Sequence, residues 1–199
     1  LLALQGGIGL FYILCMTSIA NGMNLIDGVH GLSGSVALSI LSALLFLSYK
    51  TADITMLSLI FSVILLLIPF MFVNYPYGKI FLGDLGAYSL GLIVSMLTII
   101  LFGRHPEISP WGAVLLLIYP ATEIIFSLLR RSVSKASIFK PDKLHLHLKL
   151  YYFLRSEVRN EKVANALVTP VLCCLWMYPT LVLIGVYHKP LFICAGIII

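Results

Sequence analysis

Charged side chains are scarce in this chain, and their scarcity excludes a water-soluble domain. Only 11% of the 199 residues are Asp, Glu, Lys or Arg, whereas 60% are hydrophobic, and the mean hydropathy is +1.05. A typical soluble domain has about 25% charged residues. We therefore expect an all-α fold, a polytopic integral membrane bundle of helices.

Several terminal and cysteine features are also missing. The chain begins without an initiator Met and ends in Ile197–Ile199 without a polar tail, so we expect residues 1–199 to be a single transmembrane domain forming the C-terminal part of a larger protein. Residues 1–20 lack the basic start and cleavage site of a signal peptide, which favours a membrane span. The four cysteines have no metal-ligand spacing, and we expect them to act as small hydrophobic residues.

Long apolar runs dominate what the chain does contain. A helix needs about 20 apolar residues to cross a bilayer. Candidate spans lie near residues 1–20, 33–49, 54–73, 85–102, 111–129 and 163–187, and a seventh begins near Pro190. We expect about six full spans plus a truncated seventh.

Basic residues distinguish the two ends of these spans. Successive spans alternate in direction, so the loops near 21–32, 74–84 and 130–162 must emerge on the same side of the membrane. All but three of the 13 basic residues lie on that side. By the positive-inside rule, we expect the three loops to be cytoplasmic.

The first of these loops reads NGMNLIDGVHGLSG. Asn21, Asn24 and Asp27 recur every three residues and would line one face of a helix, with His30 one turn further on. Three glycines within residues 28–34 recur at the same interval and would allow a ligand or a helix to approach the backbone closely. The pattern predicts either a polar ligand site or a capped, glycine-rich connection.

The second loop reads NYPYGKIFLGD, and its Pro-Tyr-Gly sequence indicates a turn. This turn would bring Lys79 and Asp84 to the membrane surface, with Asn74 at the other end of the loop. Asp84 would face water at a helix start, where backbone amides favour negative charge, and it suits a metal bound to a phosphate. The alternatives are that Asp84 caps the helix and that Lys79 is an ordinary cytoplasmic lysine.

The third loop follows YPATEIIFSLLRRS and contains KPDKLHLHL. Glu123 precedes Arg130 by about two helical turns, roughly 10 Å deeper in the membrane. Such a carboxylate indicates either a functional group or a structural ion pair. His145 and His147 would share one side only in an extended segment. A solvated basic loop near anionic headgroups is the alternative for this pair.

Together, these motifs resemble those of the polyprenyl-phosphate N-acetylhexosamine-1-phosphate transferases, or glycosyl transferase family 4, in order and spacing. The matching segments span residues 21–147: NGMNLIDGVHGL, NYPYGKIFLGDLGAYSLG, PATE followed by RR, and KPDKLHLHL. The superfamily includes the enzymes that start enterobacterial common antigen, O-antigen and teichoic acid linkage units. It also includes the phospho-MurNAc-pentapeptide translocase of peptidoglycan synthesis.

The resemblance implies a reaction. A polyprenyl phosphate such as undecaprenyl phosphate would attack the sugar-linked phosphorus of a UDP-N-acetylhexosamine, giving a polyprenyl-diphospho-sugar and UMP, and starting a lipid-linked cell-envelope glycan. It also implies Mg²⁺, or alternatively Mn²⁺, and a multi-pass enzyme of the bacterial cytoplasmic membrane with its active site on the cytoplasmic face. We expect no nucleic-acid partner, and a homodimer is one possible assembly.

The resemblance further implies roles for individual residues. Mg²⁺ usually takes one or two carboxylates plus substrate phosphates, which fits Asp84 as a metal ligand with Asp27 close by. Cationic groups would stabilise the charge that develops on the diphosphate. The expected catalytic residues are Asp27, Asp84, His145 and His147. The expected substrate-binding residues are Asn21, Asn24, Asn74, Lys79, Glu123 and Lys143.

This chain departs from the family pattern in three places. An Asp-Asp pair nearer the family's N-terminus is absent, position 30 is His where several members have Asp, and His-Leu-His replaces the translocase's three adjacent histidines. The last difference favours the initiating transferases over the peptidoglycan enzyme. A secondary transporter would place its site near the bilayer midplane, where only Glu123 is expected here. A non-catalytic scaffold would not need these carboxylates and histidines on one side.

Overall fold

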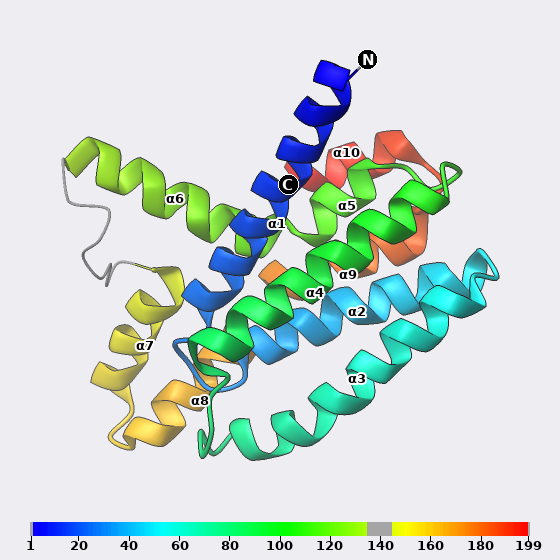
Figure 1. Cartoon of the computed structure of the whole chain (residues 1–199). Helices are drawn as coiled ribbons and strands as arrows, with labels where there is room; N and C mark the ends of the chain where they lie inside the picture. Colours follow the sequence, from blue (N-terminus) through cyan, green and yellow to red (C-terminus); the bar gives the residue numbers. More distant parts are fainter. Residues whose placement is uncertain (1, 135–144, 199) are drawn as a thin grey trace.

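All the regular secondary structure is α-helical in the residues that the computed structural model describes, which are 2–134 and 145–198 (Figure 1). Within these residues there are ten helices and no strand, which confirms the predicted all-α class. The helices are α1 (Leu2–Ile26), α2 (Leu32–Lys50), α3 (Ile54–Asn74), α4 (Gly83–Arg104), α5 (Trp111–Leu116), α6 (Ile118–Ser134), α7 (Leu146–Glu157), α8 (Glu161–Val171), α9 (Cys173–Val186) and α10 (Pro190–Ile198).

Five segments of the described chain are long and apolar enough to cross a membrane. They are Gly6–Ile26, Leu32–Lys50, Ile54–Asn74, Gly83–Arg104 and Glu161–Val186, the last of which comprises α8 and α9. These segments agree with five of the predicted spans to within a few residues at most ends. The prediction of a polytopic membrane protein is thereby confirmed.

The predicted span at 111–129 is interrupted instead of continuous. α5 ends at Leu116, Leu117 caps it, and α6 begins at Ile118 with Pro120 in its first turn. Proline has no backbone N–H and is tolerated in a first turn, so a new helix starts here more readily than the old one continues. A similar break at Leu172, two residues after Pro170, separates α8 from α9.

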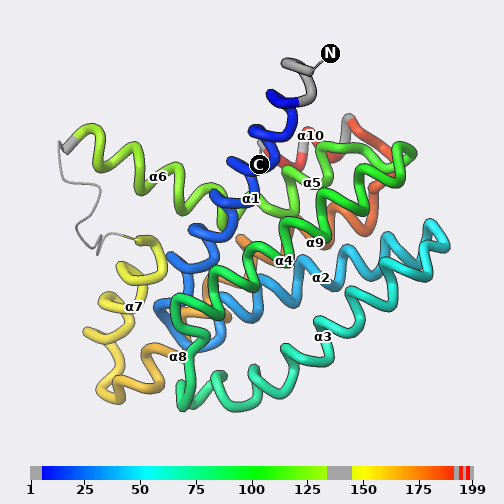
Figure 2. The backbone as a smooth tube through the Cα atoms, in the orientation of Figure 1, coloured from blue at the N-terminus to red at the C-terminus, as the bar shows by residue number. Residues whose placement is uncertain are grey.

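Despite the break, α5 and α6 carry the chain from one end of the bundle to the other. Near the start of α5, the Ser109 N–H donates to the Tyr187 carbonyl. On α6, Glu123 meets residues at the start of α7. In Figures 1 and 2, α6 extends away from the packed helices toward α7. The α1–α2 and α3–α4 connections therefore lie at the same end of the bundle as α7 and α8.

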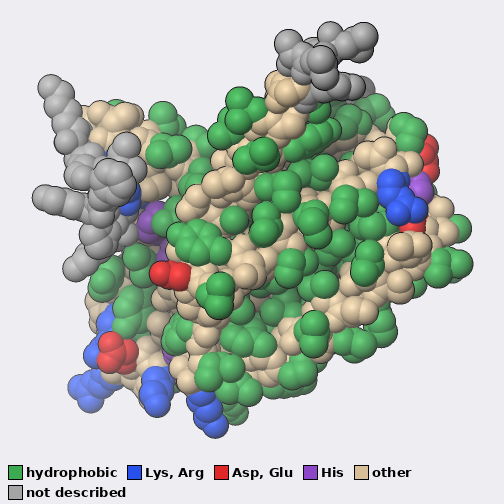
Figure 3. Space-filling model, in the orientation of Figure 1, with side chains coloured by type: hydrophobic (Ala, Val, Ile, Leu, Met, Phe, Trp, Pro, Cys, Tyr) green, Lys and Arg blue, Asp and Glu red, His purple; other side chains and the backbone are tan. Residues whose placement is uncertain are grey.

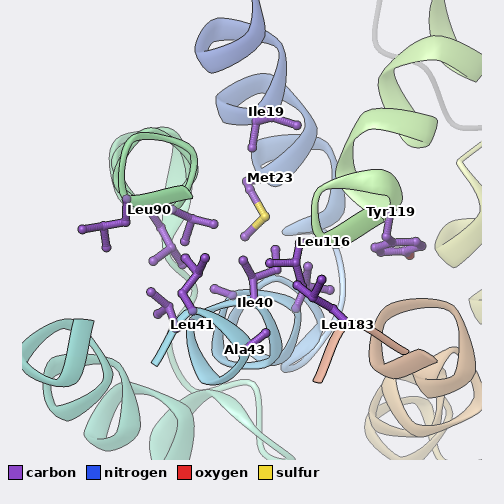
Figure 4. Close-up of a cluster of buried hydrophobic side chains, with 14 of the residues drawn as sticks. Ile19, Met23, Ile40, Leu41, Ala43, Leu90, Leu116, Tyr119 and Leu183 are labelled. Atoms are coloured by element: carbon purple, nitrogen blue, oxygen red, sulfur yellow. The ribbon is translucent and has the colours of Figure 1, made fainter. Parts of the chain in front are cut away.

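Small residues bring α1 close to its neighbours. A Cβ at Gly91 of α4 would lie 2.7 Å from the Ala20 Cα, and one at Gly22 would collide with the Pro120 carbonyl of α6. Such close approach is typical of helix packing in membranes. Around these contacts, side chains from nine of the described helices form a buried apolar cluster, part of which Figure 4 shows, with Met23, Ile40, Leu41 and Leu183 among its members.

The loops are shorter than predicted because the helices extend further. α1 continues through Ile26, so the first loop covers residues 27–31 and not 21–32. The second covers residues 75–82. Lys and Arg side chains gather at the end of the molecule formed by α7, α8 and the α3–α4 connection, and a smaller charged group lies at the opposite end (Figure 3).

Candidate functional site

Asp27 connects the first loop to the start of α4. One carboxylate oxygen accepts the Gly83 N–H at 3.2 Å, and the other accepts the Ser33 hydroxyl at 2.5 Å. Gly83 has φ of 65°, a conformation that glycine adopts without strain. Asp27 therefore satisfies, from a distant loop, one of the backbone N–H groups that are left without an intrahelical partner at the start of α4.

Asp84 lies beside this junction in the first turn of α4, and its side chain is exposed. The N-cap position of α4 is Leu82, which makes no side-chain cap hydrogen bond, so Asp84 does not cap the helix. Burial raises the pKa of Asp27 above its ordinary value of 3.8, and the nearby negative charge of Asp84 raises it further. Hydrogen bonds from Ser33 and from the amides at the start of α4 act in the opposite direction.

Asn74 joins the first and second loops. Its side chain is buried, its Oδ1 accepts the Gly31 N–H at 2.6 Å, and its Nδ2 donates to the Ile80 carbonyl at 2.6 Å. The predicted substrate-binding amide is thus engaged in holding the backbone of both loops. Lys79, on the same loop, is exposed, and its ammonium lies 5.5 Å from the centroid of the Tyr77 ring.

Glu123 holds both histidines of the third loop. His145 Nδ1 lies 3.1 Å from one carboxylate oxygen, and His147 Nδ1 lies 3.7 Å from the other. All three side chains are buried, and the two imidazole rings stack 5.6 Å apart. His145 has an extended backbone just before α7, whereas His147 is already helical. This change of conformation explains how residues two apart reach one carboxylate.

The two groups of residues meet at Gly28. A Cβ at Gly28 would lie 2.9 Å from His147 Nε2, so the imidazole rests against the backbone next to Asp27. The site thus contains two carboxylates from the first and second loops and two imidazoles from the third. All three predicted loops come together at one end of the bundle.

The remaining predicted residues are Asn21, Asn24 and Lys143, and the structure describes only the first two. Asn21 and Asn24 lie half-buried on the last turns of α1, and the Asn21 amide donates to the Thr17 carbonyl. Lys143 lies outside the described residues. The reasoning from sequence missed Ser33, which binds Asp27, and Asn165, whose Oδ1 accepts the His30 N–H. Asn165 is 135 residues from His30, and no local pattern signals that contact.

A cavity of about 520 Å³ opens beside Glu123. Most of its lining is apolar and comes from α5, α6, α9 and α10, while Arg130 and Lys149 add positive charge. The buried Tyr119 side chain also lines this cavity, and its hydroxyl has no hydrogen-bond partner among the described residues. The cavity therefore combines a long apolar wall with cationic groups close to the histidines.

The carboxylates fit a magnesium ion that is shared with a substrate. Among the residues that the structure describes, no group of three or more His, Cys, Asp or Glu side chains is arranged to hold a metal by itself. Mg²⁺ characteristically uses one or two carboxylates, waters and substrate phosphates. Asp84, exposed next to Asp27, offers that donor set.

Comparison with known proteins agrees with the motifs. A probable undecaprenyl-phosphate N-acetylglucosaminyl 1-phosphate transferase of Bacillus subtilis is 33% identical over 144 residues, covering 71% of this chain and 40% of the relative. An undecaprenyl-phosphate α-N-acetylglucosaminyl 1-phosphate transferase of Thermotoga maritima is 33% identical over 137 residues, covering 69% and 41%. A phospho-N-acetylmuramoyl-pentapeptide-transferase of Levilactobacillus brevis is 26% identical over 147 residues, covering 74% and 45%.

The chain thus spans less than half the length of these relatives. No solved structure gives a significant match. The profile of the family described as Glycosyl transferase family 4 matches residues 3–102, half of the chain, including the motifs that contain Asp27 and Asp84. With the predicted loops converging at one end of a helical membrane bundle, this match shows that the chain belongs to glycosyl transferase family 4.

Proposed function

We propose that the protein transfers N-acetylhexosamine 1-phosphate from a UDP-sugar to a polyprenyl phosphate and releases UMP. One observation carries this proposal: Asp27 and Asp84 lie at the same end of the bundle as the Glu123–His145–His147 cluster, joined through Gly28. The names of the relatives, which describe undecaprenyl-phosphate N-acetylglucosaminyl 1-phosphate and phospho-N-acetylmuramoyl-pentapeptide transferases, support the same reaction class.

The chemistry is a displacement at phosphorus. An oxygen of the polyprenyl phosphate forms a bond to the sugar-linked phosphorus, and the bond from that phosphorus to the bridging oxygen breaks, so that UMP leaves with the electron pair. The acceptor phosphate is largely ionised at neutral pH. Positioning and charge neutralisation therefore contribute more than proton removal.

Asp84 and Asp27 would hold Mg²⁺, or Mn²⁺, at this site. When bound, the ion would neutralise charge on the diphosphate and hold the reacting phosphates in line. Ser33 and the Gly83 amide fix the Asp27 carboxylate, and Asp84 is exposed beside it in the first turn of α4.

His145 would act through the ring nitrogen that does not face Glu123. The Glu123 carboxylate accepts the His145 Nδ1–H, which leaves Nε2 as the atom available to the substrate. His147 is oriented by the same carboxylate. Lys79 and Lys143 would add positive charge around the diphosphate, while Asn21 and Asn24 would hydrogen-bond the nucleotide or sugar. We assign Asn74 to holding the two loops, because its amide is already engaged.

The apolar cavity suits the lipid substrate. Its lining would receive the isoprenoid chain, while Arg130 and Lys149 would attract the phosphate toward Glu123 and the histidines. Because the isoprenoid chain is already in an apolar environment in the bilayer, its packing in the cavity and the attraction of its phosphate would retain it there.

The direct test is a transfer assay with the complete gene product in membranes. Radiolabelled UDP-N-acetylhexosamines are supplied one at a time with undecaprenyl phosphate, with and without Mg²⁺. We expect a lipid-linked labelled product and an equal amount of UMP with one donor, and neither without the metal. Absence of product with every donor, from protein shown to be folded, contradicts the proposal.

A substitution pair assigns the reaction to this site. Asp84→Asn keeps the shape of the side chain and removes its charge, so we expect Mg²⁺-dependent transfer to be lost while membrane insertion is retained. Glu107→Gln removes a charge from an exposed residue at the opposite end of the bundle and serves as the matched control. Near-normal turnover of Asp84→Asn would contradict the metal role.

A further inference from the structure

His30 is a buried hub between three segments that carry or support the site. Its side chain and backbone together are only 8% exposed. The imidazole Nδ1 lies 2.9 Å from the Pro76 carbonyl oxygen of the second loop. Its backbone N–H donates to Asn165 Oδ1 at 2.7 Å, and its carbonyl accepts the Thr169 hydroxyl at 2.6 Å. Both of these last partners belong to α8.

The hydrogen bond to Pro76 fixes which imidazole nitrogen carries a proton. A carbonyl oxygen can only accept, so Nδ1 must be the donor. The hydrogen bonds from Asn165 and Thr169 of α8 to the His30 backbone also hold this residue in place. His30 therefore connects the Pro76 loop to α8 through a donor of defined position.

The second loop is shaped to receive this ring. A Cβ at Gly78 would collide with the His30 imidazole, and Gly78 has φ of 58°, which glycine adopts readily. Phe81 also packs against the imidazole, and the centroids of the two rings lie 5.7 Å apart. The imidazole thus rests directly on the loop backbone and occupies space that a side chain at residue 78 would take.

The position of Asp84 depends on this loop. Residues 75–82 lead directly into Gly83, whose N–H binds Asp27, and then into Asp84. α8 follows α7, whose first residues hold His145 and His147 against Glu123. Contacts through His30 consequently tie the segment that carries Asp84 to the segment that carries the histidines.

We propose that His30 is a positioning residue, whose Nδ1–H bond to the Pro76 carbonyl holds the 75–82 loop so that Asp84 stays beside Asp27. The expected effect of His30 on turnover rests on the proposed transfer reaction. Its effect on the order of the 75–82 loop does not, because hydrogen exchange measures that order without any substrate. His30 itself contacts no reacting atom.

Three substitutions at position 30 separate the hydrogen bond from the bulk of the ring. Asn places an amide N–H near the position of Nδ1 and keeps the donor. Asp has nearly the same shape but presents an acceptor to the Pro76 carbonyl, and Ala removes the group altogether. His188→Ala, at an exposed histidine remote from the loop, is the control.

The test combines hydrogen exchange with transfer kinetics on the complete gene product. The Gly78 and Lys79 amides, which donate to the Asn74 and Val73 carbonyls, report on loop order. We expect their exchange to accelerate in His30→Ala and His30→Asp and to stay near wild type in His30→Asn.

Transfer kinetics should follow the same pattern. For His30→Ala and His30→Asp, kcat should fall roughly 10- to 100-fold with a smaller change in KM, whereas His30→Asn should keep a kcat near that of the wild type.

The outcomes are decisive in either direction. If His30→Asp matches the wild type in exchange and kcat, or if His30→Asn is as impaired as His30→Ala, the inference is overturned. If the wild type transfers no sugar phosphate, the proposed function fails, and the exchange pattern alone judges the role of His30. Where His30→Ala is unstable in detergent, the comparison of Asn with Asp at equal helical content decides.

Discussion

At the scale of single residues, buried carboxylates hold histidines at both ends of the molecule. Glu123 contacts His145 and His147 among the site loops, and Asp53 contacts His105 at the far end. Asp53 also receives the Met56 N–H and the Arg104 guanidinium, which compensate for its burial. Glu123 has mainly the two imidazoles, so its charge is directed to orienting them.

Replacing Glu123 with Gln tests this orienting role. The amide keeps the size of the side chain but loses the charge, and its NH₂ group is a donor that cannot accept the imidazole N–H facing it. We expect kcat/KM for transfer to fall roughly 10- to 100-fold, as when a carboxylate that orients a functional histidine is lost. The transfer assay measures this loss.

The matched control is Glu161→Gln, at an exposed glutamate that accepts a hydrogen bond from the Tyr151 hydroxyl. It should leave kcat/KM unchanged. Equal kcat/KM in Glu123→Gln and the wild type would show that the histidines do not need the carboxylate.

Residue identity singled out polar residues that lie at one end of the bundle, but it did not predict their contacts. Asp27, Asp84 and the two histidines are unusual residues in a chain this apolar, so each is visible in the sequence. The bridging roles of His30 and Asn74 are not visible in the sequence, because Pro76 and Gly31, which they contact, lie more than 40 residues away along the chain. A polar residue next to a membrane span looks the same whether it binds a ligand or another loop.

At the scale of elements, apolar length predicted the helices but not their interruptions. α2, α3 and α4 begin and end within about two residues of the predicted spans. The break at Leu117 falls within a continuous apolar run, so the average hydropathy gives no sign of it. Pro120 is the local signal that was available, since it removes a backbone donor.

The packing of α1 on α4 gives a prediction at the same scale. Gly91→Ala would place a methyl group 2.7 Å from the Ala20 Cα. The backbone of α1 would have to move to relieve this steric overlap. We expect destabilisation of about 1–3 kcal/mol, as for overpacking in a tight interior. Thermal unfolding in detergent, followed by circular dichroism, measures this effect.

Gly103→Ala in the same helix is the control, because a Cβ there meets no atom within 4 Å. It should be neutral or stabilising, since Ala favours a helix over Gly by up to about 1 kcal/mol. Identical unfolding temperatures for the two variants would refute close packing of α1 on α4 at Gly91.

The turn between α2 and α3 yields a prediction about acid. The Met56 N–H, followed by the His105 and Arg104 contacts, holds the pKa of Asp53 below its ordinary value of 3.8. A carboxyl group whose pKa is lowered on folding stabilises the protein above its ordinary pKa, and that contribution disappears as the pH falls through the lower, folded-state pKa. Acid should therefore loosen this end of the bundle.

Asp53→Asn separates the charge from the helix cap, because Asn also caps helices well. We expect a lower unfolding temperature than the wild type at neutral pH, and a difference that shrinks as the pH falls below about 4. Unfolding scans in detergent across this range measure the difference. A constant difference at every pH would exclude the charge as its source.

At the scale of the whole molecule, charge and loop convergence point to one functional face. Most of the described basic residues cluster around the site end, whereas the Asp53–Arg104–His105 group lies at the other (Figure 3). The alternation of the spans, supported by loop charge, predicted which loops share a side. It could not predict that they touch, since that depends on helix lengths and on contacts such as Asp27 with Gly83.

Orientation in the membrane is the remaining prediction, and we propose that the site faces the cytoplasm, following the positive-inside rule. Single cysteines are introduced at Ser156 on α7 and at Glu107 beyond α4, both exposed, after the four native cysteines are replaced. A membrane-impermeant maleimide should label Ser156→Cys only in inverted vesicles and Glu107→Cys only in right-side-out vesicles. The reversed pattern would place the site outside the cell, where UDP-sugars are absent, and labelling of both cysteines from one side would contradict the alternation of the spans.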